Sequence, residues 1–207
     1  MRFGYLDTNP LTGVKPKFKL NARRRFLSMA EITSLWRAAE WLSAAQRSAF
    51  RMLILLPLRK QELLLSGWQN VDSHWLFVPG ERTKNHEESA LFISDFAFSV
   101  LRAPANETGL LFTANNRTPL TLGTKISVKI TEESGVSDWV YHDFRRTFST
   151  HMNERGHPFH IIEACLNHRD PTRRGVAGVY NRAEYRAAKQ TVLQAWSDLV
   201  EEAVSGG

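Results

Sequence analysis

Two absences in the amino-acid sequence exclude several classes of protein. Cys165 is the only cysteine among 207 residues, so the chain cannot form an internal disulfide or a zinc site built from cysteine pairs. The apolar residues around it, in the segment 161–166, predict an ordinary core thiol. No stretch approaches the roughly 20 apolar residues of a membrane span, and residues 1–10 lack the hydrophobic block of a signal peptide. We therefore expect a cytoplasmic protein with no membrane partner.

Acidic residues are in the minority. The chain has 27 Lys and Arg against 21 Asp and Glu, which leaves a net charge of +6 and a pI near 9.7. This excess favours a polyanionic partner without identifying it. The length of 207 residues suits one main domain with a full core, and the sequence has no internal repeat or low-complexity tract.

The first 27 residues differ from the rest of the chain. Pro10, Gly13 and Pro16 interrupt any periodicity there, and six Lys and Arg residues crowd a short stretch from 15 to 25. We interpret residues 1–27 as a basic, extended interdomain linker and residues 28–207 as the main domain. A linker at this place predicts a further amino-terminal domain in the natural protein; the alternative is a simple tail.

The remaining pattern is mostly helical. Ser28 and Glu31 form a capping box that predicts a helix from about residue 29, and Pro57 ends a second apolar stretch at 50–56. Further helices are expected near 95–102, 121–133, 143–155, 159–167 and 184–203. Apolar runs at 75–78 and 90–93 predict a small antiparallel sheet with Lys84 in its loop. The expected fold class is mainly α with a small antiparallel β-sheet.

Several polar residues are ambiguous when each is taken alone. His142 and Arg145 lie three apart, so on a helix they can converge on one anion, or simply form a solvated helix start. Arg59 follows an apolar segment and needs either a ligand or a salt bridge to Glu62. His168 could cap the preceding helix, as readily as it could contact a phosphate.

Tyr180 lies twelve residues after His168 and would, alone, be a packing aromatic. A tyrosine hydroxyl, with a reference pKa of about 10, reacts only when nearby groups take its proton and stabilise the developing charge. The order Arg, Lys, His-x-x-Arg, His, Tyr is far less probable than any of its members, and it could supply those groups.

This ordered set resembles the catalytic domain of tyrosine recombinases, particularly phage and prophage integrases, over about residues 10–200. The similar segments are LRKQEL at 58–63, RTKN at 82–85, HDFRRT at 142–147, LNH at 166–168 and GVYNR at 178–182. Two positions depart from the family pattern. Leu56 and Pro57 stand where Thr-Gly is frequent, and Asn167 replaces a frequent Gly.

The resemblance implies the tyrosine-recombinase catalytic-domain fold and a reaction without metal or cofactor. Tyr180 would attack the scissile phosphate to give a 3′-phosphotyrosyl bond and a free 5′-hydroxyl. Arg59, Arg145 and His168 would donate hydrogen bonds to that phosphate. Lys84 would be the general acid on the leaving oxygen, His142 the acid–base partner of the tyrosine and Glu62 a structural support.

The resemblance also implies double-stranded DNA with attachment sites as partner, a tetramer on DNA, a monomer in isolation, and a location in a bacterial or phage-infected cell. The amino-terminal DNA-clasping and arm-binding domains would be absent. Contacts to the DNA backbone are expected from Lys15, Lys17, Lys19, Arg117, Lys125, Lys129 and Arg146.

Three alternatives stay open on the sequence. One is DNA relaxation of the type IB topoisomerase kind, another is a non-catalytic DNA-binding prophage remnant, and the third is a generic basic helical regulator. The amphipathic segment 184–203 could dock on a neighbouring protomer or pack on its own core.

Overall fold

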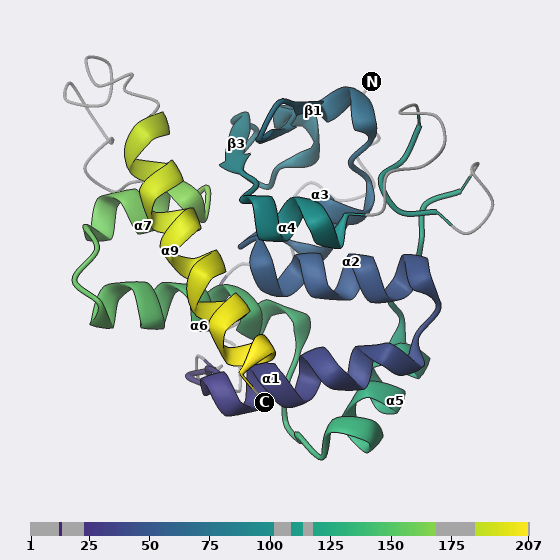
Figure 1. The fold of residues 1–207 in the computed structure, drawn as a ribbon. Helices are drawn as coiled ribbons and strands as arrows, with labels where there is room; N and C mark the ends of the chain where they lie inside the picture. Colours follow the sequence, from purple (N-terminus) through teal and green to yellow (C-terminus); the bar gives the residue numbers. More distant parts are fainter. Residues whose placement is uncertain (1–12, 14–22, 102–108, 114–117, 169–184, 207) are drawn as a thin grey trace.

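The computed structural model describes residues 13, 23–101, 109–113, 118–168 and 185–206 (Figure 1). This part of the chain is mostly helical and carries one three-stranded antiparallel sheet, which confirms the predicted fold class. Tyr180 lies outside the described residues, as do Lys15, Lys17, Lys19 and Arg117. None of the described helices is long and apolar enough to cross a membrane.

Two capping boxes start the first two helices. Helix α1 (Met29–Ala38) begins after Ser28, whose hydroxyl accepts the Glu31 N–H while the Glu31 carboxylate accepts the Ser28 N–H. Helix α2 (Ala44–Leu55) begins with the same reciprocal arrangement and ends just before Pro57, which lacks the N–H that a longer helix would need. A short 3₁₀ turn, η1 (Ala39–Trp41), lies between them.

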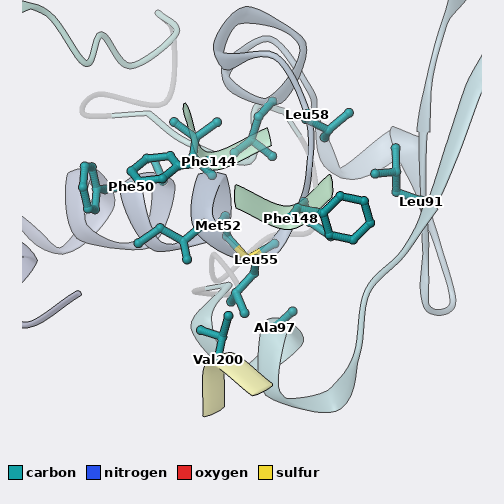
Figure 2. Close-up of a cluster of buried hydrophobic side chains, with 14 of the residues drawn as sticks. Phe50, Met52, Leu55, Leu58, Leu91, Ala97, Phe144, Phe148 and Val200 are labelled. Atoms are coloured by element: carbon teal, nitrogen blue, oxygen red, sulfur yellow. The ribbon is translucent and has the colours of Figure 1, made fainter. Parts of the chain in front are cut away.

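Helix α2 lies at the centre of the core. Phe50 is fully buried, and its ring meets the ring of Phe144 on α6 (Tyr141–Glu154) edge to face. Figure 2 shows these rings beside other buried side chains from α2, from α4 (Asp95–Val100), from the sheet and from the carboxyl-terminal helix. Interdigitation of these apolar side chains holds the elements on every side of α2 together.

The sheet follows α3 (Lys60–Leu64) and the 3₁₀ turn η2 (Trp68–Asn70). Strand β2 (Trp75–Val78) lies between β1 (Val71–Asp72) and β3 (Ser89–Phe92). The β2–β3 register pairs Trp75 with Phe92 and Val78 with Ser89. Strand β1 was not predicted from the sequence, because two residues are too few for an alternating pattern. The β2–β3 loop contains the 3₁₀ turn η3 (Gly80–Arg82) and Lys84.

Helices α5 (Thr124–Ser134) and α7 (Phe159–Cys165) complete the shell, and α9 (Arg186–Ser205) crosses α6 and ends beside α1 (Figure 1). Trp196 on α9 is fully buried and donates from its ring nitrogen to the Ile54 carbonyl oxygen at 2.9 Å. Near the end of α9 the Ala203 carbonyl accepts from the Thr33 hydroxyl. The apolar face of α9 therefore packs on the core of its own chain.

The residues just before α1 also pack on the domain. Leu27 is fully buried, and its N–H donates to the Thr147 hydroxyl on α6 at 2.9 Å. Arg23 reaches the first turn of the same helix, where it donates to both carboxylate oxygens of Asp143. The end of the basic segment thus contacts the start of α6.

Candidate active site

Arg145 is the most deeply placed of the candidate catalytic residues. It lies on α6 and is only 3% exposed. Its Nη1 donates to the Pro57 carbonyl, its Nη2 donates to the Leu166 carbonyl at 2.6 Å, and its buried Nε has no hydrogen-bond partner among the described residues. Burial, together with repulsion from Arg59, lowers the pKa of Arg145 to about 10. The guanidinium is still charged at neutral pH.

Arg59 stands at the amino-terminal cap of α3 and is held there by Glu62. The nearly buried Glu62 carboxylate accepts the Arg59 backbone N–H at 2.8 Å and its Nη1 at 2.7 Å. The salt bridge that the sequence allowed is therefore present. It also fixes the Arg59 side chain in one geometry, beside the charge of Arg145. A salt bridge and a phosphate-binding role are thus compatible.

His168 follows α7 and joins this cluster through both ring nitrogens. Nε2 lies 3.2 Å from Arg145 Nη2, and Nδ1 lies 3.0 Å from Glu163 Oε2. A guanidinium only donates hydrogen bonds, so His168 Nε2 accepts from Arg145. The ring proton is then on Nδ1, and this N–H donates a hydrogen bond to the Glu163 carboxylate. Sequence reasoning missed Glu163; the available signal was a single acidic residue in the otherwise apolar run 161–166.

His142 lies in the first turn of α6, one turn before Arg145. Burial lowers the pKa of His142, and the positive charges of Arg145, Arg146 and Arg59 lower it further, while Asp143 partly opposes them. Because the ordinary histidine pKa is already 6.5, the ring is neutral at neutral pH. A neutral imidazole can accept a proton.

Asp143 anchors the start of α6. It is fully buried and accepts the Val140 N–H at 2.9 Å, Arg146 Nη1 at 2.7 Å and Arg23 Nη2 at 2.8 Å. Burial opposes ionisation, but the hydrogen bonds from Arg23, Val140 and Arg146 together hold the pKa of Asp143 below its usual range. Arg146, which was predicted to contact DNA, thus has an intramolecular partner. The contact of Arg23 with Asp143 was not predicted, because nothing in the sequence links residues 23 and 143.

A pocket of about 220 Å³ opens over these groups. Its polar lining includes Arg24, His142, Arg145, Arg146, Glu163 and His168. The structure therefore brings His142, Arg145 and His168 to one cavity, with Arg59 and Glu62 next to Arg145. Cationic side chains around a cavity of this size are suited to bind a phosphate group. Within the described ranges, no group of three His, Cys, Asp or Glu residues could hold a metal ion.

The other predicted residues lie at the surface or outside the described part. Lys84 is exposed in the β2–β3 loop, between the buried Thr83 and Asn85. On α5, Lys125 is exposed and Lys129 Nζ lies 5.4 Å from the centre of the Trp41 ring. The predicted residues outside the described part of the chain are Tyr180, Lys15, Lys17, Lys19 and Arg117.

Comparison with known proteins assigns the chain to a family. The model of the phage integrase family matches residues 25–187, so the chain belongs to this family. It is 26% identical to the prophage integrase IntA of Escherichia coli strain K12 over 215 residues, and 29% identical to IntZ of the same strain over 198 residues. These matches cover 98% and 90% of this chain but 51% and 48% of the relatives. The chain thus spans about half the length of the curated relatives it matches.

Solved structures share the fold at lower sequence identity. The crystal structure of the XerA recombinase aligns with a TM-score of 0.60 and 18% identity, over 86% of this chain and 66% of that one. A lambda integrase dimer bound to a COC′ core site aligns with a TM-score of 0.62 and 20% identity, over 81% of this chain and 65% of that one. The fold is that of a tyrosine recombinase catalytic domain, as the sequence predicted.

Proposed function

We propose that this chain is the catalytic part of a site-specific DNA recombinase that cuts and rejoins DNA through a 3′-phosphotyrosyl intermediate formed by Tyr180. The observation that carries the proposal is the buried guanidinium of Arg145, which is held by two backbone carbonyls and lies at one pocket with His168. Among the described residues no acidic side chain is hydrogen-bonded to this buried cation, and a phosphodiester fits the role of an anionic partner.

The two arginines would act on the nonbridging oxygens of the scissile phosphate. Attack concentrates negative charge on these oxygens, and guanidinium groups fixed in advance stabilise that charge without reorganising during the reaction. Glu62 fixes Arg59, and the Pro57 and Leu166 carbonyls fix Arg145. His168, whose Nδ1 is held by Glu163, would be a third donor to the phosphate.

The two proton transfers would fall to different residues. His142, which is neutral at neutral pH, accepts the proton that Tyr180 loses on attack. Lys84 gives a proton to the leaving 5′ oxygen. The new phosphotyrosyl ester keeps the energy of the broken phosphodiester, so rejoining needs neither nucleotide nor metal.

The partner in this proposal is double-stranded DNA, with four protomers acting together on two duplexes. Support for DNA as the partner comes from two structural relatives, a lambda integrase dimer bound to a COC′ core site and the XerH recombinase bound to a palindromic difH substrate. The exposed Lys125 and the half-buried Lys129 would contact backbone phosphates, which predicts binding that weakens steeply with salt.

The test is a covalent adduct on a nicked suicide duplex, in buffer with a chelator and no divalent metal. The duplex is one that the protein recovers from a randomised pool. Wild type should form an adduct whose DNA is attached to the tryptic peptide 175–182, which contains no tyrosine other than Tyr180. Tyr180→Phe should bind the duplex and form no adduct, whereas the control Tyr185→Phe should still form it.

Two results would contradict the proposal. An adduct that survives in Tyr180→Phe would place the nucleophile elsewhere. Binding by wild type without any adduct, even after an amino-terminal DNA-clasping domain is added, would favour a DNA-binding remnant. A relaxation assay on supercoiled plasmid separates recombination from the topoisomerase alternative, because relaxation by single protomers would be fast and independent of a recovered site.

A further inference from the structure

A pair of asparagine side chains joins the β2–β3 loop to the turn that carries His168. Asn85 Nδ2 donates to Asn167 Oδ1 at 3.0 Å, and Asn167 Nδ2 donates to Asn85 Oδ1 at 3.2 Å, so each amide both gives and receives a hydrogen bond. Asn85 Nδ2 also lies 3.2 Å from the Asn167 carbonyl oxygen, and Asn167 Nδ2 lies 3.3 Å from that of Glu87. The amides therefore connect two segments that are 82 residues apart in the chain.

The backbone at Asn167 does not require this amide. Its φ of +48° lies in the left-handed region, which glycine adopts without strain and which asparagine tolerates better than most residues. A glycine would satisfy the turn but keep only the Asn85 Nδ2 bond to the residue 167 carbonyl oxygen. Asparagine also adopts this turn, and its side-chain amide adds the two hydrogen bonds with the Asn85 amide. The side chain therefore contributes a contact that the local conformation does not need.

The loop on the other side of the link carries Lys84. Thr83 is 3% exposed and Asn85 is 9% exposed, while Lys84 between them is at the surface. The Thr83 hydroxyl bonds within the loop, to the carbonyl oxygens of Gly80 at 3.0 Å and Glu87 at 2.8 Å. Among the described residues, Asn85 is the one of these three that bonds across to the other segment. The link therefore fixes the backbone next to Lys84 against the backbone next to His168.

We infer that the Asn85–Asn167 amide pair positions Lys84 to protonate the leaving 5′ oxygen. This inference rests on the proposed function. In that step the bond from the Tyr180 oxygen to phosphorus forms, the bond from phosphorus to the 5′ oxygen breaks, and a proton from the Lys84 ammonium moves to that oxygen. Asn85 and Asn167 touch neither reacting group; they are positioning residues.

Sulfur at the 5′ bridging position provides a readout specific to this role. A thiolate leaves without being protonated, because a thiol is a far stronger acid than an alcohol. Cleavage rates are therefore compared on two suicide duplexes of the same recovered sequence, one with the 5′ oxygen and one with 5′ sulfur at the scissile phosphate. The variants are Asn167→Gly, which keeps the left-handed turn, Asn85→Ala, Lys84→Ala, and the control Asn153→Ala, which removes an exposed amide elsewhere.

Lys84→Ala should slow cleavage of the oxygen substrate by about 10²–10⁴-fold, the usual contribution of a general acid. Asn167→Gly should slow it by roughly 10- to 100-fold, because a misplaced catalytic group costs about 10²-fold for a shift near 1 Å. On the sulfur substrate both deficits should shrink to within about threefold of wild type, an estimate that follows from removing the need for an acid. Asn85→Ala, which also removes the bond to the residue 167 carbonyl, should be slowed at least as much as Asn167→Gly. The double variant should be no slower than Asn85→Ala, and Asn153→Ala should match wild type on both substrates.

The outcomes separate the inference from the function beneath it. The inference is wrong if Asn167→Gly cleaves the oxygen substrate as fast as wild type. It is also wrong if Asn167→Gly is slowed equally on both substrates while sulfur restores the cleavage rate of Lys84→Ala, because the amide pair then does not position Lys84. If sulfur fails to rescue Lys84→Ala, Lys84 is not the general acid, which removes the basis of the inference while Tyr180 chemistry stands. If wild type forms no adduct with either duplex, even after an amino-terminal DNA-clasping domain is added, the proposed function itself fails. Equal melting temperatures for Asn167→Gly and wild type confirm that the comparison is between folded proteins.

Discussion

Removal of the Asp143 carboxylate should destabilise the whole domain by a predictable amount. The Val140 N–H at the start of α6 would lose its acceptor, at a cost of about 1 kcal/mol for one net hydrogen bond. The partly exposed pair with Arg146, three residues along the same helix, contributes about 0.5 kcal/mol. Asp143→Ala should therefore lower the free energy of unfolding by at least about 1.5 kcal/mol, before any contribution from Arg23.

The assay is thermal unfolding followed by circular dichroism. For a domain of this size, each kcal/mol shifts the melting temperature by about 2–4 °C, so a decrease of about 3–6 °C is expected for Asp143→Ala. Asp143→Asn is the matched control, because its amide oxygen can still accept the Val140 N–H while the charge is gone. A decrease below about 2 °C for Asp143→Ala would refute the reasoning, since it would mean that the network contributes little.

The pH dependence gives a second check of the same network. The pKa of Asp143 lies below its ordinary value of 3.8, so the folded protein binds the carboxylate proton less tightly than the unfolded chain does. The carboxylate therefore stabilises the fold fully above the unfolded pKa, and this stabilisation is lost as the pH falls through the folded pKa. The difference between wild type and Asp143→Ala should be constant near neutral pH and should shrink below about pH 4. A difference that stays constant to lower pH would contradict the assigned network.

Three further predictions concern the pocket and the core. Because the pKa of His142 is lowered from its ordinary 6.5, the cleavage rate of wild type should stay constant to a pH below 6.5 and then fall as the ring protonates. His142→Gln should cleave about 10²–10⁴-fold more slowly, and its rate should not show this decrease at acidic pH. Glu163→Gln should slow cleavage by about fivefold, because a partly exposed hydrogen bond to a charged group contributes about 1 kcal/mol. DNA binding by this variant, measured by fluorescence anisotropy, should not change. Burial raises the pKa of Cys165 to about 12, so a thiol reagent followed by mass spectrometry should leave Cys165 unmodified in the folded protein and modify it in denaturant.

The sequence predicted elements wherever a local signal was strong. The Ser28–Glu31 capping box and Pro57 marked helix boundaries that the structure places within a residue or two. The two apolar runs gave β2 and β3, offset by one residue for β3. Strand β1 was missed, because it forms only by pairing with β2, and pairing leaves no pattern in a segment of two residues.

The site was predictable as a set of residue types and much less as a set of contacts. The helical spacing of His142 and Arg145 was enough to place them on one face. The contacts of Arg145 with the carbonyls of Pro57 and Leu166 were beyond reach, because backbone carbonyls are the same at every position and only the fold selects two of them. The link between Asn85 and Asn167 was missed for a related reason, since nothing local relates residues so far apart in the chain.

Two of the three proposed phosphate donors have an acidic residue hydrogen-bonded behind them. Glu62 bonds Arg59, and Glu163 bonds His168. Arg145 is held only by neutral carbonyls and by the ring of His168, and both burial and the neighbouring Arg59 lower its pKa. Among these three donors, Arg145 is therefore the one without a hydrogen-bonded acid within the described part of the chain, although Glu62 and Glu163 act on its charge from further away. An anion that enters the pocket should gain most from Arg145, because no acidic side chain already occupies its donor atoms.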